Sequence, residues 1–378
     1  MDLILEVADY YGFDKFYATL FPIAPDSVIG STAAAAASAV THNSSPTEQI
    51  VSTFRTQAPK FLKFAANWHG NKLDRYGIAP THWFAPTEYA AESILSRDNI
   101  LRQSLTLFLI TTFFGWVLYL GTAWISYIFV YDHDNFNHPK FLKNQMRLEI
   151  IRGVTAIPTM TALTVPWFVA EAQGYSKLYY SLEDNGGYFY LFMQFPIFLL
   201  FTDFVIYWAH RWLHHPWVYK NLHKPHHKWI VSTPFASHAF HPVDGYVQSI
   251  AYHIFPFVFP LQKICYLGLF MFVNIWSVLI HDGEYLAHDP IINGSACHTI
   301  HHLYFNYNYG QYTTFWDRLF GTHRQPDKEL FNPWEKKAGK TIKKQVVEME
   351  HILAEVEGED DRVYASAVTE TVSATKRR

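Results

Sequence analysis

The chain has 378 residues, of which 18% are aromatic and 17% are charged, and its formal net charge is −3 at pH 7 with neutral histidines. Ordinary soluble domains have about 25% charged residues, so this composition favours a protein embedded in lipid, and the near-neutral charge leaves no electrostatic footprint for nucleic acid. The two cysteines, Cys265 and Cys297, indicate neither a disulfide framework nor a cysteine-rich zinc site.

The N-terminal 100 residues show three compositions in turn. Residues 1–24 mix acidic and apolar positions without a positive region before a continuous apolar core, so they do not resemble a cleavable signal peptide. Residues 25–48 are rich in alanine, serine and threonine, and residues 49–100 are polar with scattered aromatic residues. We therefore predict that residues 1–100 form an amphipathic, low-complexity and interfacial region, and that an internal segment directs the chain to the membrane.

Five apolar runs follow, and they cover residues 105–131, 154–170, 188–209, 247–260 and 264–280. The first run is long enough to cross a bilayer, which takes about 20 helical residues. The fourth run is short and contains Pro256 and Pro260, so it is predicted to be the bent or shallow half of a hairpin with the fifth run. The chain is accordingly predicted to be an all-α integral membrane protein with four to five apolar transmembrane or re-entrant helices.

Charge asymmetry between the loops predicts the orientation of these helices. The loop expected at residues 132–153 carries four basic residues, among them Arg147 and Arg152, whereas the next loop is mostly acidic. The positive-inside rule then places residues 132–153 in the cytosol and residues 1–100 in the lumen. Because the hairpin returns the chain to the side that it left, the histidine-rich segments on both sides of it are expected in the cytosol.

Histidine is concentrated in one part of the chain, since 14 of the 21 histidines lie between residues 210 and 302. Eight of them form three clusters, which are His210 and His214; His223, His226 and His227; and His298, His301 and His302. Their i,i+3 and i,i+4 separations bring side chains onto one face of a helix. A single interfacial histidine is more often a snorkelling residue than a ligand, but three such clusters beside apolar runs predict a multi-histidine metal centre at a membrane surface.

The number of histidines bears on the kind of metal. Neutral imidazole binds iron, zinc, copper and nickel, and a structural zinc site usually takes four ligands that include cysteine. Eight histidines exceed one tetrahedral site and suit two ions that share a pocket. Two redox-active irons with open positions could activate O2, and the apolar surroundings indicate a lipid substrate. We therefore expect a cytosolic, histidine-rich di-iron helical domain.

Three more histidines on the same side are candidates. His281 follows the fifth apolar run directly, and His238 and His241 form an i,i+3 pair. Each could complete the metal coordination. Each could instead donate a hydrogen bond to a ligand or be a buried polar residue.

Acidic residues could support the metal ligands. Asp203 lies seven residues before His210, two helical turns deeper on the same face of an apolar run. An ionisable group inside such a run is costly, so Asp203 is expected either to orient a ligand histidine or to bond another helix. Asp282 and Glu284 lie on the histidine side and are further candidates for the supporting role.

The cluster patterns HxxxH, HxxHH and HxxHH resemble the histidine boxes of the fatty-acid hydroxylase and sterol desaturase superfamily of membrane non-haem di-iron enzymes. Three longer stretches, residues 233–245, 280–284 and 298–318, resemble sterol C5-desaturases closely. The resemblance covers residues 101–330. It implies that these residues form a membrane-embedded catalytic domain, and that residues 331–378 are a cytosolic, partly disordered tail.

The resemblance also implies the reaction. A Δ7-sterol 5(6)-desaturase of the endoplasmic reticulum membrane removes hydrogen from C6 and C5 of a Δ7-sterol, in ergosterol synthesis if the source is fungal. By this resemblance the eight clustered histidines hold two non-haem irons, and O2 is the oxidant. Electrons come from NAD(P)H through cytochrome b5 and its reductase, and the absence of a glycine-rich dinucleotide motif fits an external donor.

Other functions fit parts of the sequence. A sterol C4-methyl oxidase or a fatty-acid hydroxylase would use the same histidine clusters but insert oxygen, and the longer stretches argue against both. A metal-handling membrane protein would need polar residues through its crossings, whereas these runs are nearly free of charge apart from Asp203.

Overall fold

The computed structural model describes residues 1–23, 65, 84–285 and 289–365. Nearly all regular structure in these ranges is helical, which confirms the all-α prediction, and the exception is one parallel pair of two-residue strands, β1 (Leu178–Tyr179) and β2 (Leu261–Gln262). The predicted low-complexity segment at 25–48 and the end of the predicted tail at 366–378 lie outside the described residues. The chain divides into two compact units, residues 1–110 with 165–177 and residues 111–164 with 178–378.

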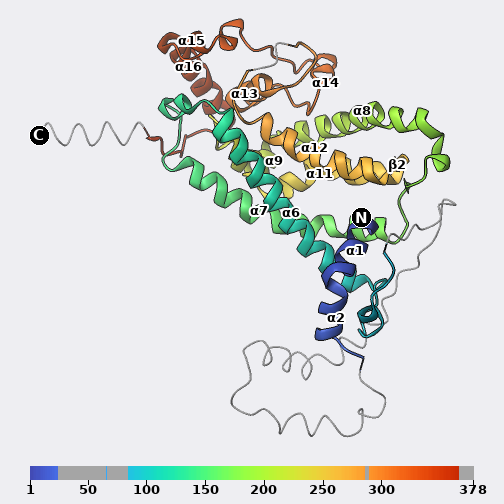
Figure 1. Cartoon of the computed structure of the whole chain (residues 1–378). Coiled ribbons are helices and arrows are strands. Elements are labelled where there is room, and N and C mark those ends of the chain that lie inside the picture. The colour runs from blue at the N-terminus through green and yellow to red at the C-terminus, as the bar shows by residue number, and fades with distance from the viewer. Residues whose placement is uncertain (24–64, 66–83, 286–288, 366–378) are drawn as a thin grey trace, which may run out of the picture. The chain divides into compact units, whose positions relative to one another are not determined.

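Three helices are long and apolar enough to cross a membrane, judged by length and composition: α6 (Ile100–Phe129), α7 (Gln145–Ala172) and α8 (Gly187–Leu213). They contain the first three predicted apolar runs. The last two runs form 17-residue helices, α11 (Pro242–Val258) and α12 (Lys263–Leu279), which are short for a full crossing of about 20 residues. Their length agrees with the predicted re-entrant hairpin, and α11 packs along α8 (Figure 1).

The prediction of a loop at residues 132–153 is wrong in its second half, because α7 begins at Gln145. The helix continues beyond the apolar run because its polar side chains find partners on a neighbouring segment. Gln145 donates to the carbonyl of Val231 at 2.7 Å, and the Arg152 guanidinium donates to the carbonyl of Phe240 at 3.1 Å. Gln145 and Arg152 at this end of α7 are therefore hydrogen-bonded within the protein.

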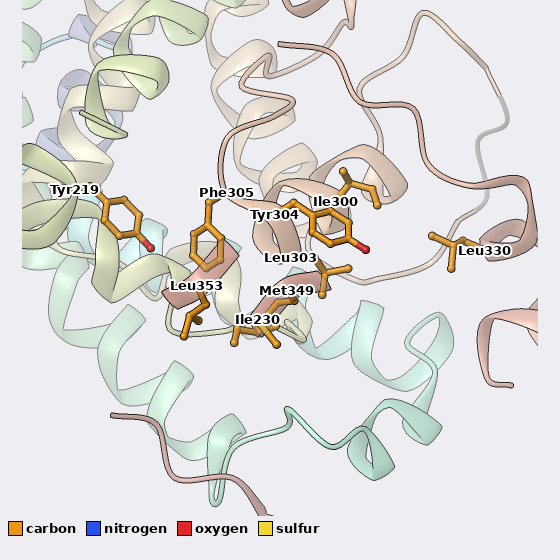
Figure 2. Close-up of a cluster of buried hydrophobic side chains, with 9 residues drawn as sticks. All are labelled: Tyr219, Ile230, Ile300, Leu303, Tyr304, Phe305, Leu330, Met349 and Leu353. Carbon is orange, nitrogen blue, oxygen red and sulfur yellow. The ribbon is translucent and has the colours of Figure 1, made fainter. Parts of the chain in front are cut away.

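The shorter helices carry the histidine-rich segments and the C-terminal part. They are α9 (Pro216–Val218), α10 (Lys224–His227), α13 (Ser295–Tyr304), α14 (Phe315–Leu319), α15 (Pro333–Lys336) and α16 (Gly339–Val356). Helix α16 packs against α13. Figure 2 shows the hydrophobic cluster around this contact, which is made of Tyr219, Ile230, Ile300, Leu303, Tyr304, Phe305, Leu330, Met349 and Leu353. The apolar residues of the predicted tail thus form part of a folded core.

The first unit holds the N-terminal helices α1 (Asp2–Ala8) and α2 (Asp14–Leu20) and is built around a buried arginine. The guanidinium of Arg102 lies 2.7 Å from the Asp9 carboxylate and 2.6 Å from that of Asp14, and all three side chains are almost fully buried. Burial by itself would raise the pKa of the Asp14 carboxyl, but hydrogen bonds from Arg97, Thr87 and Arg102 lower it to about 2.

Substitution Arg102→Met should destabilise this unit by about 3–5 kcal/mol, because two buried carboxylates lose the charge that compensates them. We expect a lowered midpoint of thermal unfolding for the full chain in detergent. Lys344→Ala removes only an exposed ion pair with Asp327 and should leave the midpoint unchanged. Equal midpoints of thermal unfolding for both variants would contradict a stabilising role for the buried contacts of Arg102 with Asp9 and Asp14.

Candidate metal centre

Nine histidines converge in the second unit into two neighbouring groups. Within each group, one nitrogen of every histidine lies within 4.8 Å of the others. The first group is His210, His214, His223, His227 and His301, and the second is His226, His281, His298 and His302. The structure therefore brings together all eight clustered histidines and adds His281 to them.

The first two clusters come from consecutive helical segments. His210 lies in the last turn of α8, and His214 caps that helix one turn later. Helix α10 begins at Lys224 and places Pro225 in its first turn. It does not begin from a loop, however, because the helical turns start at Pro216 and pass through a π-helical segment, Tyr219–His223. A π-helical turn is wider than an α-helical one and is common at functional sites.

Helix α13 supplies the third cluster from one of its faces. Ile300, Leu303 and Tyr304 point into the hydrophobic cluster of Figure 2, so the other face carries His298, His301 and His302. The helix ends because Phe305 adopts a φ of 61°, which is uncommon for a bulky residue. The Phe305 ring is fully buried and packs 5.0 Å from the ring of His227, so the end of α13 is fixed against the second cluster.

Some ring nitrogens lie within hydrogen-bond distance of two other ring nitrogens at once. His298 Nε2 lies 2.9 Å from His281 Nε2 and 3.2 Å from His302 Nε2, and His226 Nε2 lies 3.4 Å from His281 Nε2. One neutral imidazole nitrogen cannot be both donor and acceptor to two others. Among the described residues, both ring nitrogens of His227 and the Nε2 atoms of His214 and His301 are buried without a hydrogen-bond partner. Buried unpaired polar atoms are costly, so this arrangement fits bound cations.

Protonation agrees with this interpretation, since metal ligands must be unprotonated imidazoles. Burial, reinforced by neighbouring histidines, lowers the pKa well below the usual range for His214, His226, His227, His298, His301 and His302. Burial also lowers the pKa of His281 to about 4. These histidines are therefore neutral at physiological pH and have a lone pair available.

Hydrogen bonds at Nδ1 fix which nitrogen carries that lone pair. His210, His281 and His301 lie with Nδ1 3.1, 2.6 and 2.7 Å from the carbonyl oxygens of residues 309, 277 and 307. A carbonyl only accepts, so Nδ1 carries the proton and Nε2 is free to bind metal. His223 Nδ1 donates to the Asp244 carboxylate at 2.8 Å, the contact that commonly orients a metal-binding histidine.

Asp203 supports the histidine groups indirectly, through a loop. Its carboxylate accepts hydrogen bonds from the backbone amides of residues 311–313 and from the Thr313 hydroxyl, so its partners lie on a loop rather than on a histidine. Asp317 accepts from the amides of Tyr309 and Gly310, both at 2.8 Å. The two carboxylates thus hold the loop 309–313, whose Tyr309 carbonyl accepts the hydrogen bond from His210. Neither of the two predicted roles of Asp203 includes this contact with a loop.

The remaining predicted residues lie outside both histidine groups. Asp282 accepts from the Glu284 amide at 2.8 Å, and Glu284 lies 4.0 Å from the Lys336 ammonium. His241 caps helix α11 by accepting from the Val243 amide at 3.2 Å. His238 contacts the Ser237 hydroxyl and the Asn274 side chain instead.

Sequence reasoning missed the contribution of the C-terminal part. The Arg362 guanidinium donates to both oxygens of Glu357 and to the carbonyl of His227, each at 3.0 Å. Tyr219 donates to the same carboxylate at 2.6 Å, and the Lys224 ammonium lies 3.3 Å from it. Glu357 and Arg362 therefore fix the helix that presents the second cluster. The sequence signal, four acidic residues and an arginine between residues 357 and 362, is too common to identify this role.

A cavity in the second unit adjoins the histidines. Its wall includes His210, His226, His281 and His298, and apolar residues of α7, α8 and α12 together with mostly polar residues of α11. Exposed aromatic and aliphatic side chains cover the outer faces of α6 and α8, which suits contact with lipid. The cavity can thus hold an apolar molecule beside the histidine groups.

Comparisons with known proteins agree with this arrangement. The family model described as fatty acid hydroxylase matches residues 195–322. The chain is 53% identical to a Delta(7)-sterol 5(6)-desaturase of Eremothecium gossypii over 96% of this chain and 99% of that protein. It is 49% identical to a Delta(7)-sterol 5(6)-desaturase of Candida albicans, again over 96% and 99%, and 51% identical to a probable one of Neurospora crassa over 98% and 99%. No solved structure gives a significant match.

Substitution His281→Ala should lower the metal content of the purified full-length protein by about half, because the second group would keep three ligands and the first group all five. Metal per chain would be measured by plasma mass spectrometry. His351→Ala is the matched control, since that side chain is exposed on α16. Unchanged metal in His281→Ala would exclude this residue from the ligand set.

Substitution Arg362→Met should loosen the second cluster without removing a histidine, because the His227 carbonyl loses its partner and Glu357 its buried counter-charge. We expect faster metal loss to a chelator than in the wild-type protein. Arg324→Met, which removes a partly exposed ion pair with Glu348 on the same α16, should release metal at the wild-type rate.

Proposed function

This chain belongs to the Delta(7)-sterol 5(6)-desaturase family, and on that premise we propose how its residues introduce the C5=C6 double bond into a Δ7-sterol. The observation that carries the proposal is the pair of buried histidine groups at the end of an apolar cavity. The histidines provide ligands for redox metals, and the cavity provides a place for a rigid hydrocarbon substrate.

We propose that the two groups hold two non-haem irons. The donor set supports this choice, because it is made of neutral imidazoles and lacks the thiolates typical of structural zinc. The proposed ligands are the eight clustered histidines together with His281. Bound there, the irons would supply the redox chemistry that couples reduction of O2 to removal of hydrogen from the sterol.

The overall reaction balances with two external electrons. The sterol loses one hydrogen from C6 and one from C5, and O2 takes these together with two electrons and two protons to form two waters. The C6 hydrogen is allylic to the 7,8 double bond and is therefore more weakly bound than an ordinary aliphatic hydrogen.

The protein contributes position and exclusion of water. Hydrogen bonds from Nδ1 to backbone carbonyls and to Asp244 hold the imidazoles with Nε2 turned toward the metal positions. Ile206, Val273 and Ile280 are among the apolar residues of the cavity wall, and they keep water from the reacting carbons. A dry site of fixed geometry strengthens every electrostatic contact within it.

The electron supply and the location of the protein follow from the same premise. We propose that electrons come from NAD(P)H through cytochrome b5 and its reductase, and that the histidines face the cytosol from the endoplasmic reticulum membrane. Basic residues near the second cluster, Lys220, Lys224 and Lys228, support a cytosolic position by the positive-inside rule.

We also propose that residues 101–330 form the catalytic domain, with residues 1–100 on the lumenal side. The tail at 331–378 is proposed to be cytosolic. Its part up to Tyr364 packs on the catalytic residues, so this part extends the catalytic domain.

Expression of the chain in a yeast strain that lacks its own sterol C5-desaturase should restore 5,7-diene sterols, as seen by gas chromatography with mass spectrometry. His301→Ala should abolish the dienes while the protein stays in the membrane. His351→Ala should restore them fully. Build-up of Δ7-sterols with the wild-type protein present would reject the proposed reaction, and oxygenated sterols or fatty acids would favour a hydroxylase.

A further inference from the structure

One polar pair in the cavity wall has no part in holding the metals. His238 belongs to a short helical turn, Pro234–His238, and Asn274 to α12, and both line the cavity that also holds His281 and His298. His238 Nε2 lies 3.4 Å from Asn274 Oδ1, at the long limit for a hydrogen bond. Because both side chains line the cavity, a small polar group bound in it can contact both.

The other polar atoms of the two side chains, Asn274 Nδ2 and His238 Nδ1, already have hydrogen-bond partners. These partners determine which donor and acceptor the pair presents to the cavity. Asn274 Nδ2 donates to the Phe270 carbonyl at 2.7 Å, so Oδ1 is left as an acceptor. His238 Nδ1 lies 3.1 Å from the Ser237 hydroxyl, which can donate to it and leave the proton on Nε2. The pair then presents one donor and one acceptor, and a hydroxyl group matches both because it accepts and donates at once.

The position of the pair relative to the histidines fits the substrate. Asn274 lies in the last two turns of α12, and His281 follows the C-cap of that helix, seven residues or about 10 Å further along the chain. His238 lines the same cavity as His281 and His298. In a sterol, C3 carries the hydroxyl and is separated from C5 by a single carbon. The hydroxyl must therefore lie close to the histidines when C5 and C6 face the metals.

We propose that Asn274 and His238 bind the 3β-hydroxyl of the sterol and so set which ring carbons face the histidine groups. This assignment rests on the proposed function, since it takes the substrate to be a Δ7-sterol. Other polar side chains of the wall on α11 have partners elsewhere. Gln248 donates to Asp244, Ser249 donates to the Tyr246 carbonyl, Tyr252 pairs with Tyr312, and His253 Nε2 lies 3.3 Å from the Thr164 hydroxyl. The pair is thus a specificity determinant, and it leaves the metals to the nine histidines.

The test compares a Δ7-sterol with its 3-methyl ether, which cannot donate a hydrogen bond. Membranes with the full-length chain, from the yeast strain lacking its own enzyme, would be assayed for 5,7-diene formation. The wild-type protein should favour the free sterol by about tenfold in kcat/KM, in line with a site built to bind a hydroxyl. Asn274→Leu and His238→Phe should bring this preference close to one, mainly through a higher KM for the free sterol.

A matched control is available in the chain. Asn221 donates to the carbonyl four residues earlier, as Asn274 does, but it is exposed and away from the cavity. Asn221→Leu should keep the wild-type preference. The purified His238→Phe protein should also keep its metal content, because His238 lies outside both groups.

The outcomes distinguish a failure of the proposed reaction from a failure of the hydroxyl assignment. A wild-type chain that forms no diene from either sterol rejects the proposed function itself. A wild-type chain that forms diene without preference, or a preference that survives in Asn274→Leu, overturns the hydroxyl assignment alone. Loss of metal in His238→Phe would also overturn it, because His238 would then be a ligand.

Discussion

The arrangement of the two histidine groups depends on hydrogen bonds from the outer nitrogens of the imidazole rings. Imidazole has two nitrogens, and the protein binds Nδ1 of His210, His281 and His301 to backbone carbonyls and Nδ1 of His223 to a carboxylate. This leaves Nε2 as the free lone pair in each of them. Without those contacts each ring could exchange tautomers or turn toward another acceptor, so the surrounding backbone determines the ligand geometry as much as the histidines do.

That dependence explains why distant segments converge around the histidines. The carbonyl that holds His210 belongs to the loop 309–313, and this loop is held in turn by Asp203 from α8 and by Asp317 from α14. Gly310 fits there because a Cβ would approach the Thr313 carbonyl oxygen to 2.4 Å. Burying a carboxylate without partners costs free energy. Here each carboxylate accepts several hydrogen bonds, which offset that cost and hold the loop rigidly beside the histidines.

Much of this could be predicted from the sequence because the signals are local. The spacing of the clustered histidines gives the helical faces, and the long apolar runs give α6, α7 and α8. The extension of α7 to Gln145 and the contacts of Asp203 could not be predicted, since they depend on partners 86 and about 110 residues away. His238 and His281 looked alike in the sequence, and only their positions in space separate a residue of the histidine groups from a residue of the cavity wall.

The hydrogen bond from Arg362 to the His227 carbonyl has a consequence for the order in which the chain folds during synthesis. The guanidinium donates to the carbonyl of a residue 135 positions earlier in the chain. The second cluster therefore reaches its final contacts only after a segment that is synthesised later than all the histidines of the two groups. A message truncated before residue 357 would still encode every histidine box and would score as intact in any motif search. Its product would keep all nine histidines of the two groups but would lack the contact that holds the His227 carbonyl.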